Sequence, residues 1–105
     1  MNLINLLAKK FFEAFYEKEW VSEFSPHISN LDISEAYQVQ DLVAKMRIEN
    51  GEEEVGFKVG CTSHAIHSQF GLQEPIIGRL FAPHIHVEGE QLNWKDYVNC
   101  AIEPE

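Results

Sequence analysis

The spacing of apolar residues along this chain changes from the period of a helix to that of a strand. Over residues 2–18, and again from Asp32 to the Asn50-Gly51 pair, apolar side chains recur every three or four positions and so share one helical face. Asp32 or Ser34 can cap the second of these helices. From Ile76 onward, short β-branched and aromatic segments are separated by turn residues instead. Helices followed by strands predict an α+β fold rather than a regular alternation.

A glycine-flanked strand lies between these two parts of the chain. Residues 55–61 alternate apolar side chains with Gly56, Lys58 and Gly60, so these three residues share one face of the predicted strand. A lone ammonium is costly to bury without an anionic partner. A face almost bare of side chains would suit a small anionic ligand lying against the backbone. The alternative is a lysine that faces solvent and has no further role.

The segments after this strand are expected to form one short helix and several strands. Thr62 or Ser63 can cap a helix that ends at Phe70 and is closed by Gly71. The remaining β-branched and aromatic segments have the length and the flanking turn residues of strands. They are Ile76–Phe81, His84–Val87 and Leu92–Tyr97.

The composition limits the partners and the compartment. A chain of 105 residues with 45% apolar and 24% charged residues can bury one modest core. Its 17 acidic and 8 basic residues give a formal net charge of −9, which argues against nucleic acid and anionic membranes as partners. No apolar run approaches the roughly 20 residues of a membrane span, and two cysteines make no disulfide framework. We therefore expect a soluble cytoplasmic protein.

Two groups of residues have the spacing of metal ligands. Glu103 and Glu105 are two positions apart, so in an extended segment their carboxylates project to the same side. Carboxylate oxygens suit a hard divalent cation, and the alternative is an acidic, frayed C-terminus. Four histidines in two pairs support a separate hypothesis, a zinc-binding protein. They are His64, His67, His84 and His86.

Aromatic residues gather along the first predicted helix. At helical spacing such a stripe is typical of core or interface packing. It supports a hypothesis of a different class, a catalytically inert module that self-associates or binds a partner through this helix. The residues of the stripe are Phe11, Phe12, Phe15 and Tyr16.

Four blocks of the sequence resemble one enzyme family. The blocks are ISEAYQVQ at 33–40, VGFKVGCTS at 55–63, EPIIGRL at 74–80 and AIEPE at 101–105. They resemble the 2-keto-4-pentenoate hydratase and 2-oxo-3-hexenedioate decarboxylase branch of the fumarylacetoacetate hydrolase family, and they occur in the family's order. The similarity covers about residues 30–105. Family members are much longer, so the resemblance is to their N-terminal part and implies a truncated chain or fragment.

The resemblance implies a fold and a cofactor. The implied fold is N-terminal helices followed by the first strands of a fumarylacetoacetate-hydrolase-like mixed β structure. Residues 1–74 would be a helical region with one strand near 55–61, and residues 75–105 would begin an incomplete β-rich catalytic domain. The family holds Mg²⁺ or Mn²⁺ on a Glu-x-Glu pair, which the resemblance places at Glu103 and Glu105, plus a third carboxylate with no counterpart here.

The implied activity is that of a lyase on 2-hydroxydienoic or 2-oxo-enoic acids in the catabolism of aromatic compounds, in a protein that forms homo-oligomers at full length. A metal chelated by the substrate's carboxylate and 2-oxo oxygens would stabilise a dienolate. Lys58 matches the family's lysine and would neutralise the substrate carboxylate or relay a proton. Ser63 would either hydrogen-bond the substrate or only cap its helix.

One block departs from the hydratase pattern. Many hydratases read Glu-Pro-Asp-Phe-Gly where this chain reads EPIIG at 74–78, so Ile76 replaces an acid that could help to move protons. A hydratase and a decarboxylase of the same family therefore both stay open.

Overall fold

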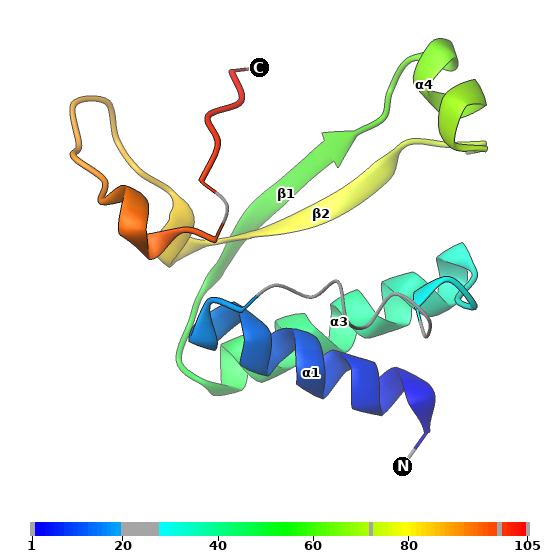
Figure 1. Cartoon of the computed structure of the whole chain (residues 1–105), viewed down its shortest axis with the longest axis horizontal. Helices are drawn as coiled ribbons and strands as arrows, with labels where there is room; N and C mark the ends of the chain where they lie inside the picture. The colour runs from blue at the N-terminus through cyan, green and yellow to red at the C-terminus, as the bar shows by residue number, and fades with distance from the viewer. Residues whose placement is uncertain (1, 20–27, 72, 99, 105) are drawn as a thin grey trace.

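A computed structural model describes residues 2–19, 28–71, 73–98 and 100–104. Figure 1 shows α1 and α3 below a β1–β2 hairpin, with α4 at the far end of the hairpin. This arrangement agrees with the predicted α+β class. The elements in chain order are α1 (Leu3–Glu17), α3 (Ile33–Glu49), β1 (Glu54–Gly60), α4 (His64–Phe70), β2 (Ile76–Phe81) and the 3₁₀ helices η2 (Ala82–His84) and η3 (Trp94–Asp96).

Capping residues define where the two long helices begin. The Asn2 side chain accepts a hydrogen bond from the backbone N–H of Asn5 at the start of α1. At the start of α3, Asp32 accepts from the backbone of Glu35, and the Glu35 side chain accepts from the backbone of Asp32. This reciprocal pair satisfies two backbone donors that helix geometry leaves open. Of the two predicted caps, Asp32 is the one used.

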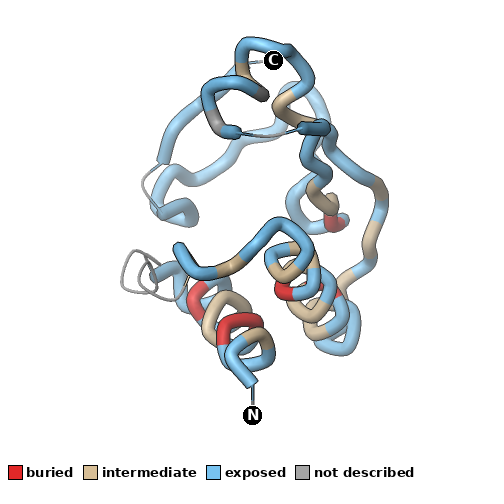
Figure 2. Tube along the Cα trace, turned by 90° about the vertical axis from the view of Figure 1, so that its right-hand side faces the viewer, coloured by how far each residue is buried: buried red, intermediate tan, exposed pale blue. Residues whose placement is uncertain are grey.

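The core of the described structure lies between α1 and α3. Leu7, Ala8 and Ala14 of α1 form a buried cluster with Val39 of α3, visible as red bands on the helices in Figure 2. Phe11 of the aromatic stripe packs against this cluster, whereas Phe15 and Tyr16 are exposed. Packing of one apolar face on each helix is the main stabilising interaction expected for such a pair.

The two strands form an antiparallel hairpin with a fixed register. Lys58 pairs with Gly78 and Val59 with Ile77, and a bulge between Glu54 and Gly56 shifts the pairing at the start of β1. A bulge of this kind adds one residue to a strand and increases its twist. The register sets which residues share each face of the sheet.

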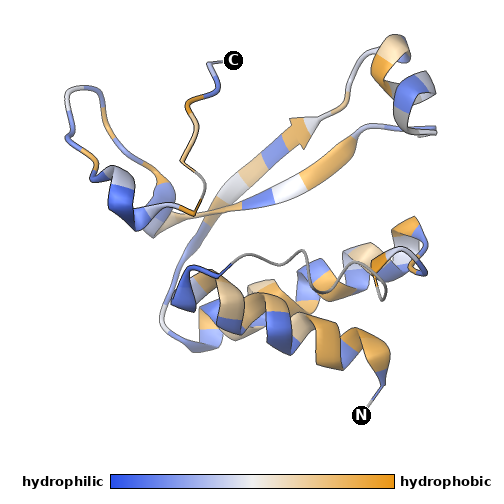
Figure 3. Ribbon diagram, in the orientation of Figure 1, coloured by the Kyte–Doolittle hydropathy of each residue, from blue (hydrophilic) through white to orange (hydrophobic). Residues whose placement is uncertain are grey.

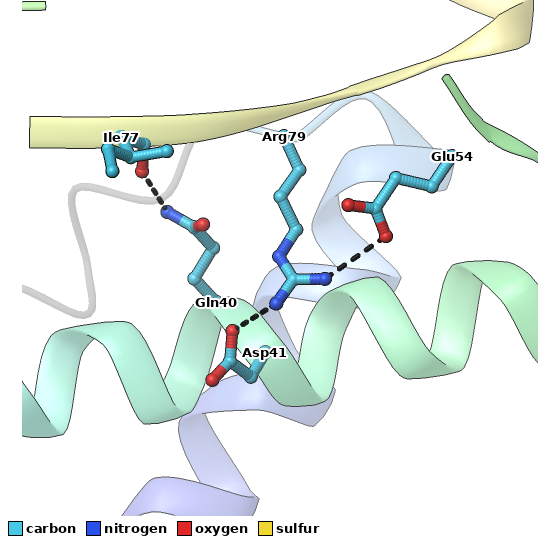
Figure 4. Close-up of polar contacts among 5 residues, drawn as sticks. All are labelled: Gln40, Asp41, Glu54, Ile77 and Arg79. Carbon is cyan, nitrogen blue, oxygen red and sulfur yellow. Dashed lines mark hydrogen bonds and ion pairs between the residues drawn. The ribbon is translucent and has the colours of Figure 1, made fainter. Parts of the chain in front are cut away.

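Helix α3 covers the outer edge of β2 (Figure 4). The backbone N–H of Ile77 donates to the Tyr37 hydroxyl at 3.0 Å. Its carbonyl accepts from Gln40 Nε2 at 3.1 Å, the contact drawn in Figure 4. The two polar groups of Ile77 that face away from β1 are thereby satisfied by a helix instead of a third strand. These contacts fix how the hairpin sits on the helices.

Two predicted strands are wrong. Residues 84–87 and 92–97 form no strand, and 3₁₀ helices occupy parts of both segments. Pro83 favours the first turn of η2, and Asn93 caps η3 by accepting from the backbone of Lys95. Strand propensity depends on a neighbouring strand to pair with, and none lies beside these segments in the described residues. Residues 22–31 have neither helix nor strand periodicity and contain Ser25, Pro26 and Asn30, which predicts a connecting loop; most of this segment lies outside the described residues.

Apolar side chains are exposed throughout the second half of the chain. Figure 3 shows apolar stretches on β1 and β2 as well as on the helices, yet Phe81 is the only buried hydrophobic residue beyond residue 50 in the described part. No helix among the described residues is long and apolar enough to cross a membrane. The sheet therefore carries an apolar surface that the described residues leave uncovered.

Candidate functional site

Lys58 lies on β1, and the residues nearest to it on its face of the hairpin are glycines, which have no side chains. Gly56 and Gly60 are two residues away on either side, and Gly78 is directly opposite on β2. Because strand side chains alternate and opposite residues share a face, the three glycines surround Lys58 on one face of the hairpin. The lysine itself is exposed. The structure thus brings together a bare backbone surface and one ammonium.

Packing among the described residues does not require these glycines. A Cβ added at Gly78 would lie 3.9 Å from the Lys58 carbonyl oxygen, and one added at Gly60 would lie 3.7 Å from Ile76 Cγ1. At Gly56 the nearest atom would be Leu80 Cδ1 at 3.8 Å. All three are ordinary contact distances, and none of the three glycines has a positive φ. The described residues would therefore accommodate a methyl group at each of these three positions.

Ile76 and Leu80 border the patch at its two ends. Ile76 pairs with Gly60, and Leu80 pairs with Gly56. Ile76, which the resemblance places at the position of an acid in many hydratases, stands on the same face of the hairpin as Lys58. The patch accordingly combines one cation with apolar ends.

Ser63 acts as a cap for α4. Its hydroxyl accepts a hydrogen bond from the backbone N–H of Ile66 at 3.2 Å. Cys61, between β1 and this cap, has a φ of 55°, a left-handed conformation that is uncommon for residues other than glycine. The sharp turn at Cys61 ends the strand and leads the chain into α4.

The carboxylates at the end of the chain are not assembled into a metal site. Glu103 is exposed in a segment without helix or strand, and Glu105 lies outside the described residues. In the part of the chain that the structure describes, no group of three or more His, Cys, Asp or Glu residues could hold a metal ion. The described residues alone do not fit the implied Mg²⁺ or Mn²⁺.

The histidines do not form a zinc site within the described residues either. His86 Nδ1 lies 2.5 Å from Glu90 Oε2, and the His84 ring packs edge-on against Phe15 at a centroid distance of 5.2 Å. The side chain of His67 lies outside the described part. Burial, together with the charges of Arg47 and His86, lowers the pKa of His84.

Arg47 joins the helices to the hairpin, a role that the sequence did not reveal. Its guanidinium carbon lies 4.3 Å from the ring centroid of Phe15 on α1 and 3.9 Å from that of Phe81 on β2. It also donates to Glu52 Oε1 at 2.7 Å, with both side chains almost buried. Burial lowers the pKa of Arg47 and raises that of Glu52. Contacts from distant segments carry no local sequence signal.

Arg79 forms a second ion-pair cluster at the base of the hairpin (Figure 4). It donates to Asp41 on α3 at 2.5 Å and to Glu54 on β1 at 3.0 Å. Burial by itself lowers the pKa of Arg79, but hydrogen bonds and charges from the two carboxylates raise it overall. This cluster ties both strands to α3.

The chain is similar in sequence to proteins with two names, 4-oxalocrotonate decarboxylase and 2-keto-4-pentenoate hydratase. The chain is 38% identical over 73 residues to a 4-oxalocrotonate decarboxylase of Pseudomonas sp, covering 70% of this chain and 28% of that protein. It is 35% identical over 74 residues to a 2-keto-4-pentenoate hydratase of Burkholderia vietnamiensis, with the same coverage. No family model matches the sequence.

Comparison with solved structures also finds a 4-oxalocrotonate decarboxylase. The fold matches a 4-oxalocrotonate decarboxylase from Pseudomonas putida G7 with a TM-score of 0.67 and 27% identity, over 74% of this chain and 30% of that one. Structures of that protein are described with calcium and acetate and with magnesium and adipate. The chain spans under a third of the length of these relatives. We conclude that the chain is homologous to the 2-keto-4-pentenoate hydratases and the 4-oxalocrotonate decarboxylases, and that it fits the N-terminal part of these proteins.

Proposed function

We propose that this chain is the N-terminal portion of a divalent-metal-dependent hydratase acting on 2-hydroxydienoic or 2-oxo-enoic acids in aromatic-compound catabolism. One observation supports the proposal above the others: Lys58 stands in a patch that three glycines keep free of side chains although packing does not require them. The relatives named as hydratases support the reaction class. We further propose a cytoplasmic homo-oligomer as the working form.

In this proposal the Lys58 ammonium binds the carboxylate of the substrate. A flat 2-oxo acid can lie against backbone where side chains would otherwise hold it away. The ammonium provides three donors and a positive charge in a chain of net charge −9. The Ser63 hydroxyl accepts from Ile66, so its own proton is available to donate to the same ligand.

For the metal, we propose that Glu103 and Glu105 contribute two carboxylates to Mg²⁺ or Mn²⁺. Two ligands make an incomplete site for such a cation, so this part of the proposal needs at least one ligand from outside the described residues. Solved relatives described with calcium or magnesium support a divalent cation in general.

A second candidate function, decarboxylation of a 2-oxo acid, is favoured by one specific observation. Ile76 borders the Lys58 patch at the position of the hydratases' acid, so the patch has no carboxylate there to help move protons during hydration. A relative and the matching solved structures are named as decarboxylases. The two reactions are distinguished by their products. A decarboxylase releases CO₂ from 4-oxalocrotonate, whereas a hydratase adds water to 2-hydroxypenta-2,4-dienoate.

Calorimetry with oxalate, a mimic of the carboxylate and oxo end of the substrate, tests the site in the purified chain with and without Mg²⁺. We expect Lys58→Met to weaken oxalate binding about tenfold, because a hydrogen bond to a charged group contributes about 1.5 kcal/mol. The matched control is Lys45→Met, an exposed lysine on α3. Glu103→Gln and Glu105→Gln should remove the Mg²⁺-dependent part of the binding.

A complementary variant fills the patch without touching any charge. Gly78→Ala places a methyl group beside Lys58 at an ordinary contact distance, so we expect unchanged unfolding but weaker oxalate binding. Equal affinity in Lys58→Met, Gly78→Ala and the unaltered chain would refute the Lys58 site. Absence of oxalate binding by the unaltered chain would leave these residues without a role in the 105-residue protein.

A further inference from the structure

Tyr37 and Gln40 lie in the block at 33–40 that resembles the enzyme family, and the proposed function gives that block no role. The block lies on α3, and the two residues are three positions apart, so they share one face of the helix. Both bind the backbone of a single residue of β2: the Ile77 N–H donates to the Tyr37 hydroxyl, and the Ile77 carbonyl accepts from Gln40 Nε2. The block therefore holds the β2 backbone at Ile77 through both of its polar groups.

Ile77 and Arg79 are the two neighbours of Gly78 on β2, and α3 contacts both of them. Asp41, one residue after the block, accepts from the Arg79 guanidinium (Figure 4). Because strand side chains alternate, Arg79 leaves the hairpin on the face opposite to that of Gly78 and Lys58. Helix α3 thus fixes β2 on either side of Gly78, from the strand edge and from the opposite face.

The register of the hairpin connects this support to Lys58. Ile77 is paired with Val59, and since the polar groups of Ile77 point to α3, this pair exchanges no hydrogen bonds between the strands. In an antiparallel ladder such pairs alternate with pairs that exchange two backbone hydrogen bonds. Gly78 and Lys58, the next pair along, are therefore of the second kind. A shift of the β2 backbone at Ile77 is passed directly to the residue that carries the ammonium.

The glycines of the Lys58 patch make such support necessary. Glycine in a strand has more conformational freedom than any other residue and no side chain to pack. Gly56, Gly60 and Gly78 all belong to the two strands, and a two-stranded hairpin is by itself marginally stable. The residues that keep the surface bare therefore also leave it poorly fixed.

We propose that Tyr37 and Gln40 are positioning residues of the Lys58 patch, which hold Gly78 opposite Lys58 through the backbone of Ile77. The inference rests on the proposed function, in which this patch binds the carboxylate of a 2-oxo acid. The two residues act without touching that ligand, because they determine where the ammonium and the bare backbone stand relative to each other. Groups that are already in place before binding do not have to be ordered by the ligand, which raises affinity.

Calorimetric titration with oxalate measures the effect on binding. We expect Tyr37→Phe and Gln40→Ala each to weaken binding about fivefold, against about tenfold for Lys58→Met, because the charge stays and only its placement is lost. The matched controls are Tyr16→Phe, the same change at an exposed position of α1, and Gln38→Ala, at an exposed position of α3. Both controls should bind oxalate as the unaltered chain does.

Amide hydrogen exchange followed by NMR reports the placement itself, without any ligand. In Tyr37→Phe and Gln40→Ala we expect the amides of Gly78 and Lys58 to exchange about fivefold faster than in the unaltered chain, because this pair opens locally more often. The amide of Leu7, in the core of α1, should exchange at an unchanged rate.

Asp32→Ala separates positioning from stability. It removes the cap of the same helix without removing a contact to Ile77, so it should lower stability but leave the oxalate affinity of the folded chain unchanged. A loss of affinity in Asp32→Ala equal to that in Tyr37→Phe, or exchange that rises equally at Gly78 and Leu7, would overturn the positioning role.

The same titrations distinguish failure of this inference from failure of the proposed function. Weaker oxalate binding in Lys58→Met, with full affinity in Tyr37→Phe and Gln40→Ala, would overturn the positioning role and keep the Lys58 site. Equal affinity in these three variants and the unaltered chain, or no oxalate binding at all, would overturn both.

Discussion

The helix pair and the hairpin differ in how far they bury their apolar side chains. Five of the six buried hydrophobic residues of the described structure lie on α1 and α3, and one, Phe81, lies at the end of β2. Valines and a phenylalanine of β1 stay about half exposed. Two helices can bury one apolar face each against the other, whereas a two-stranded sheet needs another layer or further strands to do the same. The helices are therefore locally complete and the hairpin is not.

The largest expected effect comes from removing the core of the helix pair. Leu7 is fully buried, so we expect Leu7→Ala to lower the free energy of unfolding by about 3 kcal/mol, from lost apolar contact and the cavity left behind. Val87→Ala, at an exposed position after β2, should change it by less than about 0.5 kcal/mol. Urea unfolding at low chain concentration measures both. Similar losses of unfolding free energy in the two variants would contradict the view that the helix pair holds the core and the second half of the chain does not.

A smaller effect is expected at the junction of the two regions. Arg47→Ala removes the partner of the nearly buried Glu52 and the cation between Phe15 and Phe81. We expect a loss of about 2 kcal/mol, below the roughly 3–5 kcal/mol of a fully buried pair because both groups keep some solvent contact. Thermal unfolding followed by near-ultraviolet circular dichroism reports this change.

Arg47→Lys is the control for this junction. It keeps the charge but cannot reproduce the planar stacking and paired donors of a guanidinium, so its stability should lie between those of Arg47→Ala and the unaltered chain. If Arg47→Ala unfolds at the same temperature as the unaltered chain, the helices and the hairpin are not held together by this residue.

The capping box gives a more local test on the helix side of the comparison. Asp32→Ala removes the acceptor for the backbone N–H of Glu35 and should cost about 1 kcal/mol. Ser34→Ala is the matched control, since Ser34 was the other possible cap and lies within the first turn of α3. Chemical unfolding monitored by far-ultraviolet circular dichroism should separate the two variants. Equal losses would mean that Asp32 is not the working cap.

The smallest effect is expected from pH at the junction. Burial, followed by the nearby charges of Arg47 and His86, lowers the pKa of His84 in the folded chain below its ordinary 6.5. The neutral imidazole is favoured on folding, so its contribution is full above pH 6.5 and declines as the pH falls from there to the lowered pKa. We expect a slightly lower urea midpoint at about pH 5.5 than at about pH 7.5.

His84→Gln should flatten this slope. Glu52 acts in a different window, since its raised pKa favours the folded chain below pH 4.5 and that contribution is lost as the pH rises through the raised value. A slope between about pH 7.5 and 5.5 that is the same in His84→Gln and the unaltered chain would assign it to another group.

Local patterns predicted the elements that depend on local chemistry. The periodicity at residues 2–18, a cap at Asp32 or Ser34 and the alternation around Lys58 predicted α1, α3 and β1 within a residue or two of their ends. The segments at 84–87 and 92–97 failed because β-branched and aromatic residues favour a strand only beside a partner strand. Pro83, just before the first segment, and Asn93, near the start of the second, each favoured a 3₁₀ turn instead.

The site was predictable in one part only. Alternation in β1 was enough to place Gly56 and Gly60 around Lys58, but Gly78 enters the patch through the register with β2, which no local pattern reveals. Arg47 was missed for a related reason, because its partners Phe15 and Phe81 come from segments far apart in the chain. The functional roles of Lys58, Ser63, Glu103 and Glu105 stay predictions.

The cover that Tyr37 and Gln40 give to Ile77 has a consequence for how many chains can join. A hairpin with two open edges could recruit copies at both sides and grow into a fibril, as cross-β polymers do. Here α3 occupies the outer edge of β2, so a further strand cannot be added at that edge. Tyr37→Phe combined with Gln40→Ala would uncover this edge, and a dye that reports amyloid would register growth into an open polymer.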